Sequence, residues 1–309
     1  MNTAATAFLF PGQGSQTVGM GKDLSEKFAV ARATFDEADE ALGKKLSQLC
    51  FEGPEDQLRL TENTQPAILT VSVAAWRVLE EKGINAGFLA GHSLGEYSAH
   101  VAAGTISFSD AVRTVRNRGK YMQEAVPLGT GAMAAIVGMS LDAVGAVCGD
   151  AAEGQVCEPA NINSPDQIVI SGHAAAVERA VKLAQERGAK RAILLPVSAP
   201  FHCSLMKPAQ ERLAVDLQKL ELAAPKIPVV SNVYAKPVED AESSREALVR
   251  QVTGSVNWSD SMQLLIARGV QTFVEVGPGK VLCGLMRQID RSRKCVNVED
   301  EASLGKIFR

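Results

Sequence analysis

The stretch FLAGHSLG, residues 88–95, decides the fold that we expect for this chain. Its apolar start predicts a short buried strand, and the segment from Leu94 onward predicts a helix. Gly91 and Gly95 stand two residues before and two residues after Ser93, and such small residues let the start of the helix pack against the strand. The turn between strand and helix is therefore sharp, and it leaves the Ser93 hydroxyl exposed as a candidate nucleophile.

A chance match is the alternative interpretation, because a bare G-x-S-x-G pattern is common. The strand–turn–helix context favours the nucleophile. The first N–H of a helix has no partner within the helix. The N–H of Leu94 is therefore a candidate donor to an oxyanion that forms beside Ser93.

Short apolar runs alternate with longer amphipathic stretches along the rest of the chain, which is typical of an α/β fold. The strands that we expect are 5–10, 88–90, 132–139, 156–161, 167–171, 192–197, 227–232 and 272–276. The helices that we expect are 66–81, 94–103, 108–124, 141–152, 174–187, 204–220, 245–252 and 258–267.

One segment predicts a different order of strands and helices from the rest of the chain. Residues 132–197 predict the order β-α-β-β-α-β, which is the ferredoxin-like pattern. Pro127 ends the helical pattern before this segment, and the α/β alternation resumes after it. We therefore expect a ferredoxin-like subdomain at 128–198, inserted into a large α/β catalytic domain made of 1–127 and 199–309.

Composition excludes several classes of protein. The 309 residues are 46% apolar and 22% charged, which excludes a disordered chain. The formal net charge of −3 argues against a nucleic-acid binder with a basic footprint. No apolar run approaches the ~20 residues that span a bilayer, and the first ten residues do not resemble a secretory signal. We expect no membrane segment and a cytoplasmic location.

The six cysteines indicate neither a disulfide framework nor a metal site. They include no C-x-x-C pair and no histidine at ligand spacing. We expect buried thiols in a reducing cytoplasm.

A serine nucleophile needs a base, and the chain has four histidines. His92 adjoins Ser93 and points away from it on a tight turn. His100 lies seven residues further on, along the helix expected at 94–103, and His173 starts a helix in the ferredoxin-like segment, far from the turn in topology. His202 remains as the best base, because it lies where the chain returns to the large domain. The alternative is that His202 is a capping or buried histidine without a catalytic role. The neighbouring Cys203 could itself be a nucleophile, but it has no second histidine to activate it.

The first loop, FPGQGSQ at 10–16, follows the expected first strand. It matches neither the dinucleotide-binding nor the Walker A pattern, because glycines are missing where those patterns require them. Open α/β sheets bind ligands at the carboxyl ends of their strands. Gln13 could therefore supply a side-chain or backbone donor there, and a plain tight turn is the alternative.

Arg118 lies at the edge of the apolar face of the helix 108–124, on the side that we expect to be buried. A buried cation needs an anionic partner. A structural salt bridge is one interpretation. The other is a guanidinium fork that binds the carboxylate of a substrate.

Several motifs together resemble the malonyl-CoA:acyl-carrier-protein transacylases of type II fatty-acid synthesis. They are FPGQGSQTVGMG (10–21), TQPAILT (64–70), AGHSLGEYSA (90–99), RNRGKYMQEAVPLGTGAMAAI (116–136), SAPFHCSLM (198–206) and EVGPGKVL (275–282). The resemblance covers nearly the whole chain. It implies a hydrolase-like large domain with a mostly parallel sheet and an inserted ferredoxin-like subdomain.

The resemblance also implies roles for the candidate residues. Ser93 would take the malonyl group as an ester, and His202 would act first as base and then as acid. A backbone carbonyl, which falls on Gln251 here, would orient the histidine. The N–H groups of Leu94 and Gln13 would form the oxyanion hole.

Two further residues would set specificity in such an enzyme. Arg118 would pair with the free carboxylate of the malonyl group. Phe201 would disfavour branched malonyl groups, although stand-alone members of the family do not all follow this rule.

The expected partners are malonyl-CoA and a holo acyl carrier protein, with coenzyme A thioester as substrate and no resident cofactor. We expect a monomer. Because carrier proteins are acidic, we also expect a basic docking rim. The candidates are Lys190, Arg191, Arg287, Arg291, Arg293 and Lys294, for which a solvated surface is the alternative.

Two other functions remain open at this point. A serine thioesterase or other hydrolase would share the turn at Ser93, but the chain offers no clear triad aspartate. A non-catalytic module that docks carrier proteins is the second alternative, and the intact set of Ser93, Arg118 and His202 argues against it.

Overall fold

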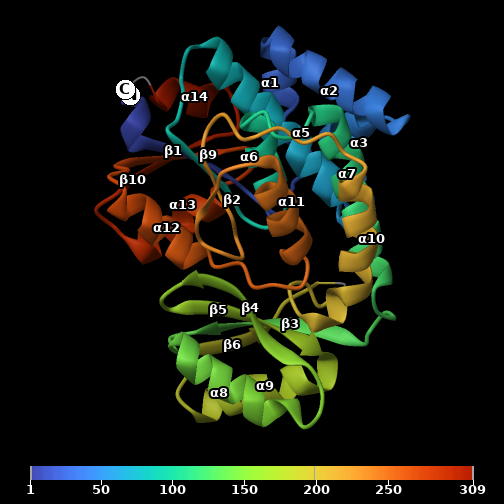
Figure 1. The fold of residues 1–309 in the computed structure, drawn as a ribbon, viewed down its shortest axis with the longest axis vertical. Helices are drawn as coiled ribbons and strands as arrows, with labels where there is room; N and C mark the ends of the chain where they lie inside the picture. Colours follow the sequence, from blue (N-terminus) through green and yellow to red (C-terminus); the bar gives the residue numbers. More distant parts are fainter. Residues whose placement is uncertain (1, 198, 308–309) are drawn as a thin grey trace.

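Two β-sheets, one above the other, organise the computed structural model of the chain (Figure 1), which describes residues 2–197 and 199–307. The larger sheet has six strands in the order β10-β9-β1-β2-β7-β8. The smaller sheet has four strands in the order β4-β5-β3-β6. The fold is therefore α/β, as the alternation of apolar and amphipathic segments predicted.

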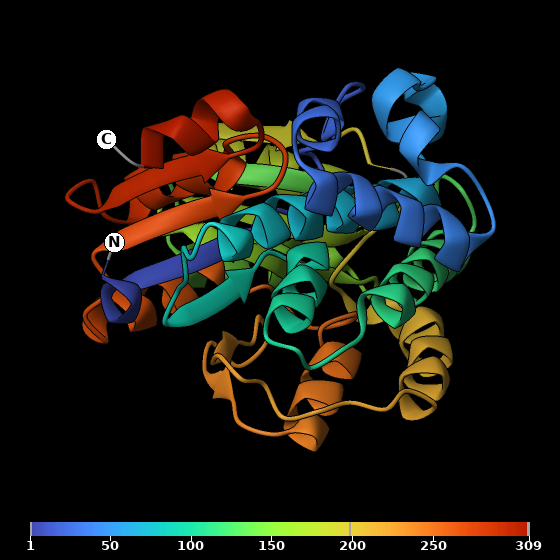
Figure 2. The ribbon, with the colours of Figure 1, turned by 90° about the horizontal axis from the view of Figure 1, so that it is seen from above.

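The larger sheet is parallel except at one edge. Its strands are β1 (Thr6–Phe10), β2 (Phe88–Gly91), β7 (Val229–Val230), β8 (Pro237–Val238), β9 (Thr272–Val276) and β10 (Lys294–Val298). Only the pair of β7 and β8 is antiparallel. Figure 2 shows β10, β9, β1 and β2 side by side, so their carboxyl ends share one edge of the sheet.

Helices cover both faces of this sheet, because its central strand is apolar on both sides. Phe8 and Phe10 of β1 pack into one core with the helices α2 (Ala29–Leu42), α5 (Thr61–Glu81), α6 (Leu94–Ala102) and α7 (Phe108–Glu124). Ala7 and Leu9 pack into the other core with α12 (Trp258–Ala267) and α13 (Val281–Ile289). This alternation of faces is the period of two of a β-strand.

The smaller sheet is antiparallel and has its own core. Its elements are β3 (Gly131–Val137), α8 (Leu141–Ala152), β4 (Cys157–Ser164), β5 (Gln167–His173), α9 (Ala174–Glu186) and β6 (Arg191–Leu194). Buried side chains of both helices and of the sheet form one apolar cluster. The order β-α-β-β-α-β is the ferredoxin-like order that the sequence predicted. The boundaries at 127/128 and 198/199 stay a prediction, and position 198 lies outside the described residues.

The remaining helices complete the larger unit. They are η1 (Thr3–Ala5), α1 (Lys22–Lys27), α3 (Leu46–Glu52), α4 (Glu55–Leu58), η2 (Ser204–Met206), α10 (Lys207–Gln218), α11 (Ala241–Arg250) and α14 (Glu301–Ile307). The expected ranges of α7, α8, α12 and β9 match the structure. Helix α5 begins five residues earlier than expected, with Pro66 inside it, so the prediction that this proline starts the helix is wrong.

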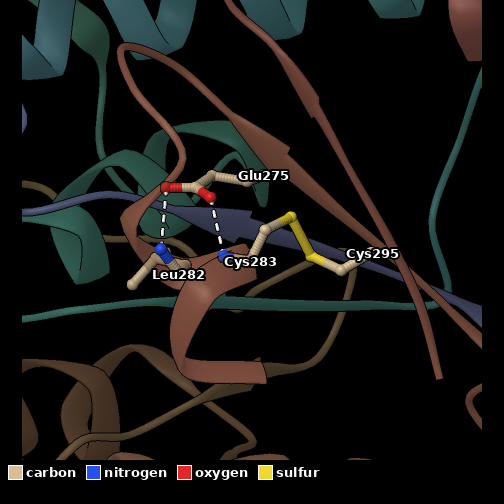
Figure 3. Close-up of a disulfide and its surroundings, with 4 residues drawn as sticks. All are labelled: Glu275, Leu282, Cys283 and Cys295. Atoms are coloured by element: carbon tan, nitrogen blue, oxygen red, sulfur yellow. Dashed lines mark hydrogen bonds between the residues drawn. A yellow bond between two sulfur atoms is a disulfide. The ribbon is translucent and has the colours of Figure 1, made fainter. Parts of the chain in front are cut away.

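The prediction of buried thiols is wrong for one pair of cysteines. Cys283 of α13 and Cys295 of β10 form a disulfide (Figure 3). The helix packs against the strand, which brings the two Cα atoms to 5.4 Å, a normal spacing for a disulfide. Their separation of 12 residues carries no local signal of this proximity. The other four cysteines are buried free thiols, as predicted.

Two structural features of residues 2–197 and 199–307 bear on function. No helix among them is both long enough and apolar enough to cross a bilayer. In the same residues, no three potential metal-ligating side chains come together.

Candidate active site

Ser93 occupies the sharp turn between β2 and α6. Its backbone has φ 51° and ψ −105°, a conformation that L-residues rarely adopt. A Cβ atom on Gly91 would collide with the carbonyl group of Gly95, and one on Gly95 would collide with the carbonyl oxygen of Phe10. Both glycines are therefore required by close backbone packing, as their spacing around Ser93 predicted.

His202 lies beside Ser93, although 109 residues separate them in the chain. The distance from Ser93 Oγ to His202 Nε2 is 2.7 Å. His202 Nδ1 lies 2.9 Å from the carbonyl oxygen of Gln251 and 3.2 Å from that of Gly254. Carbonyl oxygens only accept hydrogen bonds, so Nδ1 carries the proton and Nε2 presents its lone pair to the hydroxyl.

The imidazole of His202 is held neutral by its surroundings. Burial, reinforced by the positive charge of Arg118, lowers the pKa of His202 to about 3. The ring is only 4% exposed and is oriented by carbonyl oxygens, with no carboxylate at Nδ1. A neutral ring can accept a proton from Ser93 at any pH at which the protein would be assayed.

Arg118 reaches the same point from α7. Its side chain is 1% exposed, and Nη2 donates to Ser93 Oγ at 3.1 Å and to Gln251 Oε1 at 2.8 Å. Nη1 donates to Gln65 Oε1 at 2.8 Å, and Nε has no hydrogen-bond partner among the described residues. All three acceptors are uncharged, so the described residues do not form the structural salt bridge that the sequence left open. A buried guanidinium without an ion pair is suited to an anionic ligand.

Two buried side chains tie this cluster to the turn at Ser93. Gln251 Nε2 donates to the carbonyl oxygen of Ser93 at 2.9 Å and to Glu96 Oε2 at 2.6 Å. Asn232 Oδ1 accepts from the N–H of Ser93 at 2.7 Å. Burial raises the pKa of Glu96 to about 7. Gln65, Glu96, Asn232 and the side-chain contacts of Gln251 were not predicted from the sequence; the signal that could have found them is Glu96, the one carboxylate of α6, three residues after Ser93.

The other histidines lie away from the hydroxyl, as expected. His92 Nε2 lies 2.8 Å from Asn163 Oδ1, and burial lowers its pKa. His100 is fully buried without a partner for either ring nitrogen, and burial lowers its pKa to about 3. His173 precedes α9, and its Nδ1 accepts from a backbone N–H. Burial raises the pKa of Cys203 to about 11, so this thiol is not an activated nucleophile.

A cavity of about 140 Å³ opens onto the Ser93 hydroxyl. Its size suits a small acyl group more than a large ligand. Gln13, Leu94 and Phe201 are among the residues that line it. The complete lining is Gln13, Gln65, His92, Ser93, Leu94, Arg118, Met122, Met133, Asn161, Leu195, Val197, Phe201 and His202.

The chain belongs to the acyl transferase family, since the family model of the acyl transferase domain matches residues 7–309. Within it, the chain belongs to the malonyl CoA-acyl carrier protein transacylases. The malonyl CoA-acyl carrier protein transacylase of Escherichia coli strain K12 is 54% identical over 284 residues, which are 92% of this chain and 92% of that protein.

Solved structures give the same result. The chain superposes on an acyl carrier protein S-malonyltransferase from Vibrio cholerae with a TM-score of 0.96 and 50% identity, covering 98% of this chain and 99% of that one. It also matches a malonyl-transacylase in complex with its holo type II PKS acyl-carrier protein, with a TM-score of 0.95, 49% identity and coverage of 97% and 98%. The chain is therefore an acyltransferase, and the thioesterase and the non-catalytic docking module are set aside.

Proposed function

We propose that this chain transfers the malonyl group from malonyl-CoA to acyl carrier protein through an ester on Ser93. The transfer is the activity of the family, and the proposal concerns the residues that perform it. The observation that carries it is Arg118: a buried cation without an ion pair lies 3.1 Å from the oxygen of the nucleophile. An acyl group that carries its own carboxylate fits this arrangement, and a neutral acyl group does not.

In the first half-reaction, Ser93 Oγ attacks the thioester carbonyl of malonyl-CoA, and its proton passes to His202 Nε2. The 2.7 Å hydrogen bond between these atoms is the path of that proton. The tetrahedral intermediate then breaks its C–S bond. The coenzyme A sulfur leaves with the proton that His202 returns, and the malonyl group remains as an ester on Ser93.

The second half-reaction repeats these steps with a different thiol. The phosphopantetheine thiol of the carrier protein gives its proton to His202 and attacks the ester carbonyl. Ser93 Oγ then leaves and recovers the proton. The carbonyl oxygens of Gln251 and Gly254 hold the ring in one tautomer throughout.

The negative charge of the tetrahedral intermediate is stabilised by hydrogen-bond donors that are in position before the reaction begins. Leu94 is the first residue of α6, so its N–H has no partner within the helix, and the residue lines the cavity. Gln13 lines the same cavity from the loop after β1. We assign the oxyanion hole to these two backbone N–H groups.

The carrier protein would dock on the basic cluster made of Arg287, Arg291, Arg293 and Lys294. These side chains line a surface hollow of about 510 Å³ together with Gln288. Gln288 accepts a hydrogen bond from Ser164, whose neighbour Asn163 contacts His92 beside the nucleophile. An acidic carrier protein would complement the positive charge of this cluster. We also expect a monomer in the cytoplasm.

Intact-mass spectrometry after incubation with malonyl-CoA or acetyl-CoA tests the proposal. The wild-type chain should gain one malonyl group, and Ser93→Ala should gain none. Arg118→Ala should lose the preference for malonyl over acetyl by about tenfold to hundredfold, because one charge-assisted pair contributes roughly 1.5–3 kcal/mol. Adding a holo carrier protein should move the malonyl group to its thiol. An Arg118→Ala variant with an unchanged malonyl-to-acetyl ratio would show that this arginine does not select the substrate.

A further inference from the structure

The side chain of Asn232 bridges both ends of the turn that carries the nucleophile. Asn232 follows β7, the neighbour of β2, and is completely buried. Its Oδ1 accepts from the N–H of Ser93 at 2.7 Å, and its Nδ2 donates to the carbonyl oxygen of Gly91 at 2.7 Å. One amide group therefore satisfies the N–H of Ser93 and the carbonyl oxygen of Gly91, on either side of His92 in the turn.

Regular secondary structure supplies neither of these bonds. Pairing between β2 and β7 ends at Ala90 and Val230, and α6 begins only at Leu94. Without Asn232, the two peptide groups would be buried and unpaired, which costs free energy. The positive φ of Ser93 adds strain, and a strained residue keeps its conformation only where its surroundings over-determine it.

The other contacts of Asn232 fix the position of its amide. Its backbone N–H donates to Glu96 Oε2 at 3.2 Å, and its carbonyl oxygen accepts from the N–H of Asn257 at 2.9 Å. Glu96 Oε2 also accepts from Gln251 Nε2, which donates in turn to the carbonyl oxygen of Ser93. The N–H and the carbonyl oxygen of Ser93 are thus held by the side chains of Asn232 and Gln251. Both of these residues also donate to Glu96.

We propose that Asn232 is a positioning residue for malonyl transfer: its amide holds Ser93 in the backbone conformation that presents Oγ to His202 Nε2. It touches neither substrate nor the reacting atoms. The inference rests on the proposed role of Ser93 as acyl carrier. If the wild-type chain gained no malonyl group on Ser93, the proposed role of Ser93 would be wrong. That result is distinct from a failure of the Asn232 proposal, which only the variants of Asn232 test.

The bridge needs a donor and an acceptor on one short side chain. An ionised aspartate offers two acceptors, so its second oxygen would face the carbonyl oxygen of Gly91 and repel it. A protonated aspartic acid has an O–H that can donate to the same oxygen. Asn232→Asp should therefore be defective when the introduced carboxyl is ionised and should recover when it is protonated.

The test is the single-turnover rate of malonylation of Ser93, followed by quenched intact mass between pH 5 and pH 8.5. At pH 8 the Asn232→Asp rate should fall about tenfold to hundredfold, with KM for malonyl-CoA little changed because Arg118 keeps its contacts with Gln65 and Gln251. The rate should rise again as the pH falls. The wild-type rate should not rise as the pH falls. The low pKa of His202, about 3, keeps the ring neutral. Protonation of Glu96, whose pKa is about 7, weakens the hydrogen bonds that hold Asn232 and Gln251.

A matched control distinguishes this effect from a general loss of stability. Asn63 is also buried, its Oδ1 accepts from Lys44 Nζ at 2.7 Å, and its Nδ2 donates to the carbonyl oxygen of Gln57 at 2.9 Å. Asn63→Asp makes the same exchange away from the nucleophile and should leave the rate and its pH profile unchanged.

A second variant covers the case in which Asn232→Asp does not fold at pH 8. The hydroxyl of Asn232→Ser can reach only one of the two peptide groups, so its malonylation should be slow at every pH, without recovery. The proposal is overturned if Asn232→Asp malonylates at the wild-type rate at pH 8, or if its rate is low but independent of pH. It is also overturned if Asn232→Ser stays within twofold of the wild type.

Discussion

Glu96 on α6 and Glu275 on β9 are both fully buried, and burial raises the pKa of each to about 7, yet their partners differ. Glu96 accepts from Asn232 and Gln251, which are 136 and 155 residues away in the chain. Glu275 accepts from the backbone N–H groups of Leu282 and Cys283, seven and eight residues later (Figure 3).

The difference separates two uses of a buried carboxylate. Around Ser93, polar side chains from distant segments are joined to one another, so the arrangement depends on the whole fold and sets the geometry of the reacting atoms. Where α13 packs against β9 and β10, which we call the α13–β10 corner, the Glu275 carboxylate and the disulfide join segments that are close in sequence. We therefore expect changes around Ser93 to alter the rate of malonylation and changes at the α13–β10 corner to alter stability alone.

The largest stability effect that we expect is at the α13–β10 corner. Replacing both Cys283 and Cys295 by alanine should lower the free energy of unfolding by about 3 kcal/mol, because the disulfide restricts the unfolded chain. Denaturant unfolding without reductant measures this loss, and malonylation in the absence of denaturant should be unchanged. A reductant should weaken the wild type to a similar extent and leave the double variant unaffected. Equal unfolding midpoints for the wild type with and without reductant would contradict the disulfide.

The contrast also explains what could be predicted from the sequence. The turn at Ser93 was predictable because it depends on glycines two residues away. The buried side of Arg118 was predictable because a helix repeats every 3.6 residues. His202 followed by elimination, and the carbonyl of Gln251 followed from family resemblance.

The partners of these residues could not be predicted in the same way. Gln65 and Asn232 are polar residues of ordinary appearance, and they contact Arg118 and Ser93 only because the chain folds back over 53 and 139 residues. The disulfide joins a helix to a strand without a local motif. The helices of residues 22–58 were not predicted. Three of them, α1, α3 and α4, are only four to seven residues long, and tertiary packing against α5 stabilises all of them.

A smaller effect is expected from His100, on the same helix as Glu96. Its pKa is lowered to about 3 in the folded chain, against about 6.5 when exposed. Between these values the unfolded chain binds more protons than the folded chain, so His100 makes the protein less stable as the pH falls. The part of the free energy of unfolding that depends on a neutral His100 is fully present above pH 6.5 and is lost as the pH falls towards 3.

Replacing His100 by leucine should remove this acid sensitivity. Between pH 6.5 and pH 4.5 the free energy of unfolding of His100→Leu should fall less than that of the wild type, by about 2–3 kcal/mol. The raised pKa values of Glu96 and Glu275 act in the opposite direction over this range, but both chains contain them, so they cancel in the difference. Unfolding curves at several pH values measure the difference, and parallel curves for the two chains would contradict the expectation.

The smallest expected effect tests the comparison of the two glutamates directly. At pH 8, Glu96→Gln removes the charge from the hydrogen bonds that hold Asn232 and Gln251, and charge-assisted bonds are stronger than neutral ones. Malonylation should slow about fivefold, which corresponds to about 1 kcal/mol. Glu275→Gln leaves one of its two N–H partners without an acceptor and should lower the free energy of unfolding by about 1 kcal/mol, with the malonylation rate within twofold of the wild type.

The two variants have the same chemistry and the same burial, so only the partners of the carboxylate differ between them. Single-turnover malonylation and denaturant unfolding, both at pH 8, would be measured on each. If Glu275→Gln slowed malonylation as much as Glu96→Gln, the rate would depend on stability in general and the division between the two regions would fail. A normal rate in Glu96→Gln would show instead that the acceptor oxygen alone, without its charge, is sufficient to hold the turn.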